Sequence, residues 1–359
     1  PMYWHGHEMV FGYAMAVIAG FLLTAVKAWT SLAMPVGWRL LGIFVPWALA
    51  RLGWAVMPFV ESVTVTMLMM ITSLWLDIIF LGLICAVIGS AVWRARQKRQ
   101  AGVVAILIAL LCCQMGFGIS SLLGLEAITK ICLYVALLLV IGMVLVIGRR
   151  VLPFFIEKGV GADSEGQPIG TQVALKNSIW LDRAVFVSFF GVALGLLTAM
   201  PLLISVSAVI SACCQAWRLL NWHHKGIWAK PLLWSLYLAF WGMAMSLGLL
   251  AILPWTSYPV SLGVHSLALF GIGLTTLAMM ARVSLGHTGR NIHKPPKTVA
   301  IIFLLMIACA LIRAILPMAV EDYLHLMSWA QLCWIASFVI FLFSYFKMLI
   351  RPRVDGIAG

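Results

Sequence analysis

The chain has 359 residues, of which 64% are hydrophobic and only 10% are charged, and its mean hydropathy is +1.07. Soluble domains are about half apolar and a quarter charged, so this composition excludes a soluble globular protein and indicates an integral membrane protein. The formal net charge of +13 would favour a nucleic-acid partner in a soluble protein, but topology explains it here and we predict no nucleic-acid binding.

Eleven apolar segments follow one another along the chain, each near the ~20 residues that cross a bilayer. Open strands would leave backbone groups unpaired in lipid, so we predict that all of them are helices. The predicted segments are 8–28, 38–57, 63–92, 101–119, 126–148, 180–200, 203–222, 229–252, 261–284, 298–317 and 325–348. The predicted fold is an all-α polytopic membrane protein, a single transmembrane bundle over 1–359 with one long hydrophilic loop at 149–179.

Basic residues gather in every second connection between these segments. All but four of the 24 lysines and arginines lie in or beside those connections or on the C-terminal tail. The other connections carry acidic residues instead: Glu61, Glu126, Glu321 and Asp322. By the positive-inside rule the basic connections, including the loop 149–179, are cytoplasmic. We therefore predict a cytoplasmic C-terminus and an outer position for the start of the first segment.

That first segment opens with an unusual polar stretch, Trp-His-Gly-His-Glu-Met, at residues 4–9. Imidazole and carboxylate groups are costly in hydrocarbon, so polar groups at the mouth of a membrane helix indicate function. His5 and His7 are two residues apart and point about 200° away from each other on a helix. We expect only one of them to face any given partner.

Three stretches, residues 4–30, 148–155 and 265–290, resemble the NnrS family of bacterial membrane proteins. They match in order and position, and the similarity covers essentially the whole chain. The resemblance implies a protein of about twelve helices in the bacterial inner membrane that binds haem and copper. It also implies a role in nitric oxide metabolism or resistance to nitrosative stress in denitrifying or pathogenic bacteria. Because family members usually carry one more N-terminal helix, we expect that helix to be missing from this chain.

The predicted topology sorts the histidines into two groups that cannot share one site across ~30 Å of hydrocarbon. The outer group is His5, His7, His265 and His325, and the inner group is His223, His224, His287 and His293. With the family resemblance, the outer group suits haem better, and we predict His7 and His265 as axial ligands. His5 is the substitute or a copper ligand. His325 is also a candidate metal ligand, although a polar surface explains it more simply.

The haem is expected to be b-type and non-covalent, because the chain has no CxxCH motif. Arg51 and Arg313 lie near the same predicted depth as the outer histidines. A guanidinium there is expensive unless paired, and haem propionates would be suitable partners, with Glu61 and Asp322 as competitors. Asp77, in the middle of the third segment, is either a structural partner of Arg51 or a proton carrier.

On the inner side, residues 284–293 end the ninth segment with glycines, His287, Arg290 and His293. Arg149 and Arg150 end the fifth segment on the same side, so this pair could form a cationic pocket with Arg282, His287 and Arg290. Three explanations stay open for these residues: an inner metal site, a clamp for an anion or propionate, and plain anchoring by positive charge.

Three functions follow from these patterns. The first is a haem- and copper-binding protein that handles nitric oxide or iron-nitrosyl species, with redox activity at the haem left open. No outer histidine cluster lies on the middle segments, so we do not expect an oxidase-type binuclear centre. The alternatives are a transporter of a metal, haem or small ion, and a non-catalytic membrane sensor that needs a partner protein.

Overall fold

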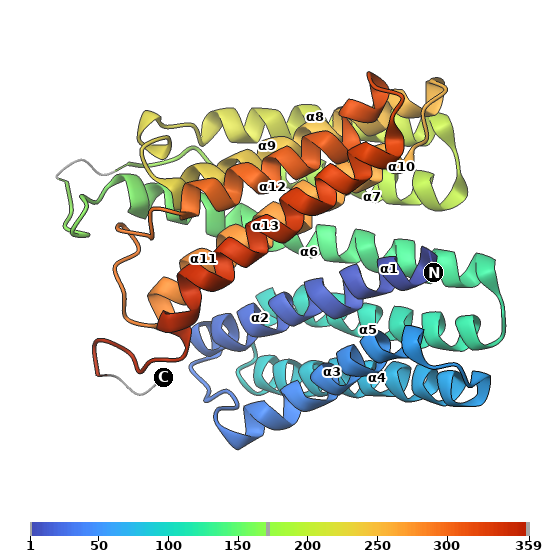
Figure 1. Ribbon diagram of the computed structural model, residues 1–359. Coiled ribbons are helices and arrows are strands. Elements are labelled where there is room, and N and C mark those ends of the chain that lie inside the picture. Colours follow the sequence, from blue (N-terminus) through green and yellow to red (C-terminus); the bar gives the residue numbers. More distant parts are fainter. Residues whose placement is uncertain (1, 170–172, 357–359) are drawn as a thin grey trace. The chain divides into compact units, whose positions relative to one another are not determined.

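The structure is a computed structural model that describes residues 2–169 and 173–356. Within those residues it contains no β-strand beyond one isolated bridge. Eleven helices are long and apolar enough to cross a membrane (Figure 1). Their bounds are Tyr3–Thr30, Trp38–Phe59, Val63–Arg94, Lys98–Leu122, Glu126–Val160, Ile179–Thr198, Pro201–Asn221, Pro231–Trp255, Ser261–His287, Val299–Met318 and Tyr323–Leu349. The predicted all-α fold with eleven membrane-spanning helices is therefore confirmed.

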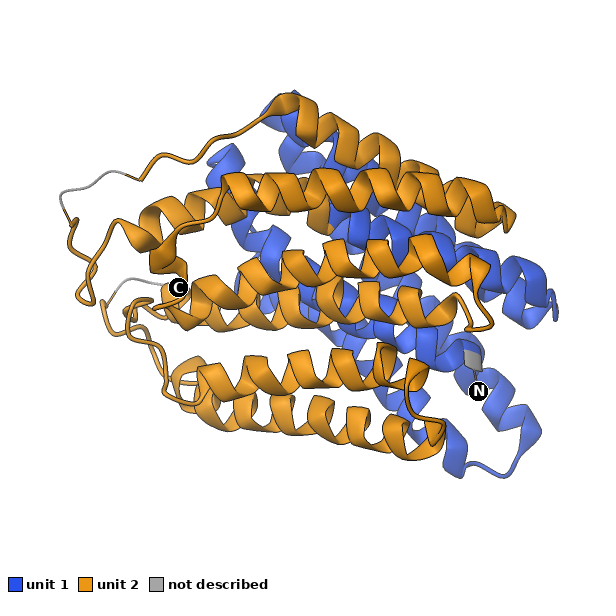
Figure 2. Ribbon diagram, turned by 90° about the horizontal axis from the view of Figure 1, so that it is seen from above, with its two compact units in different colours: residues 1–143 blue, residues 144–359 orange. Residues whose placement is uncertain are grey.

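The chain divides into two compact units, residues 1–143 and residues 144–359, shown in two colours in Figure 2. The boundary falls inside helix α6 (Glu126–Val160), which contributes its first half to one unit and its second half to the other. The single bundle over 1–359 and the cytoplasmic C-terminus stay predictions.

The first unit is built from four membrane-spanning helices, which precede the first half of α6. Its elements are α1 (Met2–His7), η1 (Glu8–Ala14), α2 (Met15–Thr30), α3 (Trp38–Val56), η2 (Met57–Phe59), α4 (Val63–Arg94), η3 (Lys98–Gln100) and α5 (Ala101–Leu122). Helix α4 packs against α2, α3 and α5. Trp54, Leu74 and Phe117 form a buried apolar cluster on three of these helices. This cluster forms one wall of the candidate site.

The opening helix of this unit is not α-helical throughout. Elements α1, η1 and α2 follow one another without a break, but η1 is a π-helix of seven residues. A π-helical turn is wider than an α-helical turn and leaves a backbone carbonyl without its usual partner, and such turns are frequent at functional sites. Here the Trp47 indole N–H donates to the carbonyl of Gly12, within η1, at 2.9 Å.

The second unit surrounds the buried helix α9. Its elements after α6 are α7 (Ile179–Thr198), α8 (Pro201–Asn221), η4 (Lys225–Ile227), α9 (Pro231–Ile252), η5 (Leu253–Trp255), α10 (Ser261–Ala268), η6 (Leu269–Leu274), α11 (Thr275–His287), α12 (Val299–Ala314), η7 (Leu316–Met318) and α13 (Tyr323–Leu349). Helices α8, α10, α11 and α12 all pack against α9. The helix run α10–η6–α11 again contains a π-helix, η6.

The hairpin of α7 and α8 shows how the sequence sets this close packing. Ala199 adopts a left-handed conformation with φ of 51°, and Pro201 starts α8 at the position where its missing N–H costs nothing. A side chain on Gly195 would lie 2.8 Å from the backbone nitrogen of Ile204. The glycine therefore allows the two helices to approach at the hairpin.

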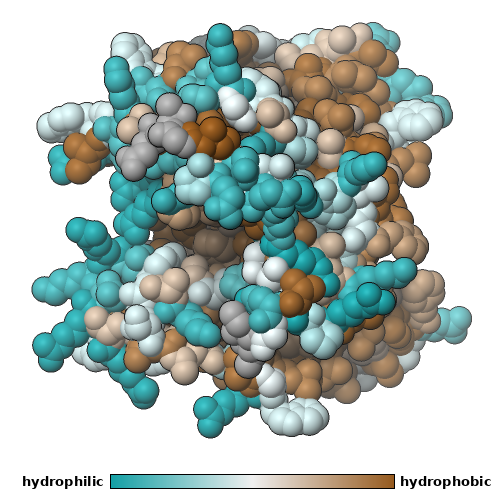
Figure 3. All heavy atoms as spheres, turned by 90° about the vertical axis from the view of Figure 1, so that its left-hand side faces the viewer, coloured by the Kyte–Doolittle hydropathy of each residue, from teal (hydrophilic) through white to brown (hydrophobic). Residues whose placement is uncertain are grey.

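The predicted loop 149–179 is wrong at its beginning. Helix α6 continues through Arg149 and Arg150 to Val160, so the connection starts at 161. The apolar residues after the arginines keep the helical spacing, and Leu152 and Ile156, four residues apart, are both buried. Pro153 lies inside the helix and removes one backbone hydrogen bond, a cost that this packing offsets. Hydrophilic residues gather on the face that carries the connections of this end (Figure 3).

Candidate functional site

The first unit contains a buried polar cluster around His7. His7 is fully buried at the end of α1, whereas His5 is exposed. The His7 ring stacks on Phe117 at a centroid distance of 4.8 Å and contacts Phe11 and Trp54, each at 5.3 Å. Aromatic rings therefore surround the His7 imidazole ring, and the polar contacts of this residue are made through its two ring nitrogens.

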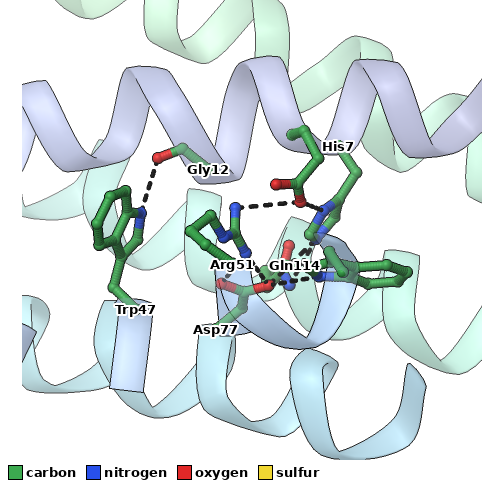
Figure 4. A network of polar contacts seen from close by, with 8 residues as sticks. His7, Gly12, Trp47, Arg51, Asp77 and Gln114 are labelled. Carbon is green, nitrogen blue, oxygen red and sulfur yellow. Dashed lines mark hydrogen bonds and ion pairs between the residues drawn. The ribbon is translucent and has the colours of Figure 1, made fainter. Parts of the chain in front are cut away.

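Both ring nitrogens of His7 have polar neighbours. Nδ1 lies 3.0 Å from Oε1 of Glu8, and Nε2 lies 3.1 Å from the amide nitrogen of Gln114 (Figure 4). A carboxylate can only accept and an amide nitrogen can only donate. The arrangement therefore fits a neutral imidazole that donates from Nδ1 to Glu8 and accepts at Nε2 from Gln114.

Arg51 joins two carboxylates in the same cluster. Its Nη2 lies 2.5 and 2.6 Å from the two carboxylate oxygens of Asp77, and its Nη1 lies 3.1 Å from Oε1 of Glu8. The Trp54 indole N–H donates to Asp77 at 3.4 Å, and Asp77 Oδ2 lies 3.7 Å from Nε2 of His7. Of the partners considered for Asp77 and Arg51 from the sequence, the structure brings these two together.

The close approach of Arg51 depends on Gly12. Any Cβ on Gly12 would overlap Nη1 of Arg51 and would lie 3.2 Å from the Glu8 carboxylate. With a neutral His7, two carboxylates face one guanidinium, so the cluster has a formal charge of −1. Chemically, it is suited to bind one further positive charge.

Gln114 and Glu8 are the members of the cluster that sequence reasoning did not assign. Glu8 belongs to the polar opening stretch, and Gln114 is an amide within an otherwise apolar helix. Gln114 is fully buried, and its side-chain oxygen has no hydrogen-bond partner. Burying an amide in a membrane helix costs free energy unless the amide is hydrogen-bonded. A glutamine within an apolar segment is therefore the sequence signal that points to Gln114.

In the second unit, His265 lies on α10 with its ring held in one tautomer. Nδ1 lies 2.7 Å from the carbonyl oxygen of Ser261 and must donate to it, so Nε2 carries the lone pair. Nη2 of Arg313 lies 3.2 Å from that Nε2. A histidine whose Nδ1–H is fixed by a carbonyl is a typical metal ligand through Nε2. A metal bound to this nitrogen would displace the guanidinium of Arg313 from Nε2. Arg313 would then remain nearby as a positive charge.

The remaining predicted residues have varied surroundings. His325 is exposed, and its Nδ1 lies 2.7 Å from Asp322, as expected for a polar surface. His287 is also exposed, and its carbonyl accepts from Arg353. Half-buried Arg290 donates to the carbonyls of Thr288 and Met348, at the end of α13.

Arg149 has a carboxylate partner and does not stand as an isolated cation. Its Nη1 lies 3.1 Å from Asp182, which also accepts from buried Arg218 at 3.1 Å. Arg218 has a further acceptor in the side chain of Gln215. Arg150 is exposed.

The donor sets differ in how well they suit the two cofactors that the sequence suggested. Among the described residues, no three His, Cys, Asp or Glu side chains converge on a point that would hold a metal ion, so the structure offers no copper site of that kind. A haem iron needs only one or two imidazoles, and His265 has the tautomer for it. His7 and His265 belong to different units, and their pairing stays a prediction.

Comparison with known proteins supports the family resemblance. A family model described as NnrS protein matches residues 1–353. In comparisons with curated proteins and with solved structures, no match was found. The matched region includes all eleven membrane helices and both histidine sites. The chain is therefore a multi-pass membrane protein that belongs to the NnrS family.

Proposed function

We propose that this protein binds a non-covalent haem b and handles nitric oxide or iron-nitrosyl species in the bacterial inner membrane. The observation that carries the proposal is His265, whose Nδ1 is hydrogen-bonded to Ser261 and whose Nε2 faces the Arg313 guanidinium. An imidazole in the ligand tautomer beside a cation is a suitable pair for an iron and a propionate carboxylate.

Each residue has a distinct role in this proposal. His265 would supply the axial nitrogen, and the Ser261 carbonyl would keep its ring in the required orientation. Arg313, which also lies 5.6 Å from the Tyr323 ring, would bind a propionate carboxylate. Haem, when bound, supplies a ferrous iron that takes nitric oxide. His7 is proposed as the second ligand, for which Gln114 would have to give up its hydrogen bond to Nε2.

The test is the haem content of purified variants. Protein from haem-replete cells is purified in detergent, and haem is quantified per polypeptide from the Soret band and the pyridine haemochrome. We expect His265→Ala to lose most of the haem and His7→Ala to change the spin state or lose haem. His325→Ala is the matched control, because His325 is exposed and paired with Asp322, and it should keep the wild-type spectrum. An unchanged Soret band in both site variants would refute the ligand assignment.

Copper is the second proposed cofactor, and it is measured in the same preparations by elemental analysis. His5 is the proposed copper ligand of the outer group. The described residues contain no group of three His, Cys, Asp or Glu side chains that could hold a metal ion. We therefore expect at most weakly bound copper, which a chelator removes. One tightly bound copper per chain, lost in His5→Ala, would assign the site to that residue.

A transporter of a metal or small cation is the second candidate function. It is favoured by the buried cluster of Glu8, Arg51, Asp77 and His7, whose formal charge is −1 and which suits one further cation. If this function is correct, vesicles that contain the haem-free protein should take up a cation. The substitution Asp77→Asn should abolish that uptake. If the protein binds haem and vesicles containing it take up no cation, the result would exclude the transporter and favour the haem function.

A further inference from the structure

Arg282 on α11 is a buried cation without an acidic partner. Only 8% of the residue is exposed, and its guanidinium carbon lies 3.9 Å from the centre of the Phe155 ring on α6. No acidic side chain of the described residues lies within ion-pair distance of it. Arginine is rarely this buried unless paired, so this residue requires an explanation.

Half-buried Arg51 and buried Arg218 do have anionic or amide partners. Arg51 is bound by Asp77 and Glu8, and Arg218 is bound by Asp182 and Gln215. Arg218 also lies over an aromatic ring, that of Trp222, in addition to its carboxylate. An aromatic ring alone is therefore not how this protein usually accommodates a buried guanidinium.

Lys230 adds positive charge near Arg282, and the His293 imidazole lies close to both. Lys230 and His293 lie close enough for the charge of Arg282 to act on both. Burial lowers the pKa of Lys230, Arg282 adds to the effect, and the carboxylate of Asp163 opposes it. Burial also lowers the pKa of His293, followed by the charges of Lys230 and Arg282. Among the described residues, Asp163 is thus the one carboxylate that acts on Lys230 and His293.

Asp163 is already engaged elsewhere. Its carboxylate accepts the backbone N–H groups of Glu165 and Gln167, both at 2.8 Å. Lys230 uses its own donors on the carbonyls of Gly159 and Ala162, both at 2.6 Å, at the C-terminal end of α6. Among the described residues, no hydrogen bond joins the N–H groups of Arg282 to an acceptor.

Little of this arginine is exposed to water. A membrane arginine near a helix end usually extends its head group into water, and such a residue would be well exposed. Arg282 is five residues from the end of α11, about 7.5 Å along the axis, yet it is almost entirely covered. The Phe155 ring holds the guanidinium plane in place but accepts none of its N–H groups.

We propose that Arg282, stacked on Phe155, is the anchor of a phosphate-binding site at the basic end of the second unit. A planar guanidinium binds two phosphate oxygens at once, and the Lys230 ammonium adds positive charge beside it. Basic pockets between membrane helices take up phospholipid head groups. The phosphate is carried either by an anionic phospholipid or by free phosphate. The site does not depend on haem.

The test compares thermal stability with two phosphate sources in delipidated, detergent-purified protein. One arm adds phosphatidylglycerol in mixed micelles, and the other adds inorganic phosphate, with chloride at equal ionic strength as the reference. We expect at least one source to raise the Tm of the wild type. Arg282→Gln should bind that source about tenfold or more weakly, because a charge-assisted bidentate contact is lost. The arm that gives the shift identifies the source.

Arg183→Gln is the matched control, because Arg183 is exposed in the same unit and stacks on the Trp180 ring at 5.3 Å. It should bind like the wild type. Arg282→Lys keeps the charge but loses the paired contact, and it serves if the glutamine variant does not fold. It should bind more weakly than the wild type. Equal binding by the wild type and the Arg282 variants, or no shift of the wild type with either source, would overturn the proposal.

Discussion

Replacing Arg51 with methionine tests the buried cluster of the first unit most directly. The side chain of Asp77 is 3% exposed and that of Arg51 is 17% exposed, so Asp77 would lose its cation in a site that water hardly reaches. Removing one partner of a buried ion pair typically costs about 3–5 kcal/mol. Because 1 kcal/mol shifts the midpoint of a domain of this size by a few degrees, we expect Arg51→Met to lower the Tm by roughly 10 °C.

The eight free cysteines of the chain provide the assay, because a thiol-reactive dye reports their exposure as the protein unfolds in detergent. Arg39→Met is the control, since Arg39 is exposed on the same helix, and its Tm should stay within a degree or two of the wild type. The double variant Arg51→Met/Asp77→Leu should recover most of the loss, because apolar replacements of a buried ion pair are often neutral. A double variant no more stable than Arg51→Met would refute the reasoning.

Two further predictions concern backbone positions. Gly12→Ala should lower the Tm, because the added methyl group would overlap Arg51. Gly20→Ala is the control and should be tolerated, because no atom lies within 4 Å of the added carbon. Equal changes of Tm in the two variants would contradict this prediction. The backbone N–H of Gln167, with help from a neighbouring amide, holds the pKa of Asp163 below its usual value of 3.8. Order in this turn is therefore present above that value and lost as the pH falls through the lowered pKa. Hydrogen exchange of the bonded amides should show this loss, and Asp163→Asn should remove the pH dependence.

The sequence predicts the helices well because hydrophobic length is a strong signal in a membrane protein. It fails where that signal is interrupted. The arginine pair at 149–150 suggested the start of a loop, yet α6 continues to Val160 because Leu152 and Ile156 bury the same face of the helix. Basic residues inside a membrane helix and basic residues at its end therefore look alike in the sequence.

The candidate sites were harder to predict than the helices. Depth along the membrane can be read from the sequence, and it placed Arg51 near the outer histidines. The rotation of each helix about its axis cannot be read in the same way, so Asp77 could be named as a partner of Arg51 but not chosen over the alternatives. Gln114 and Lys230 were missed because their roles depend on groups more than 60 residues away in the chain.

The π-helical turn Glu8–Ala14 has a consequence for how this region tolerates insertions and deletions. Deleting one residue there would convert the turn to ordinary α-helix and swing everything before it by about 100° around the axis. His7 would then point at a different neighbour, although the hydropathy profile of the segment would barely change. Two homologues with equally apolar first helices can thus differ in whether the imidazole reaches the interior, and the spacing between His7 and Gly12 is the feature that distinguishes them.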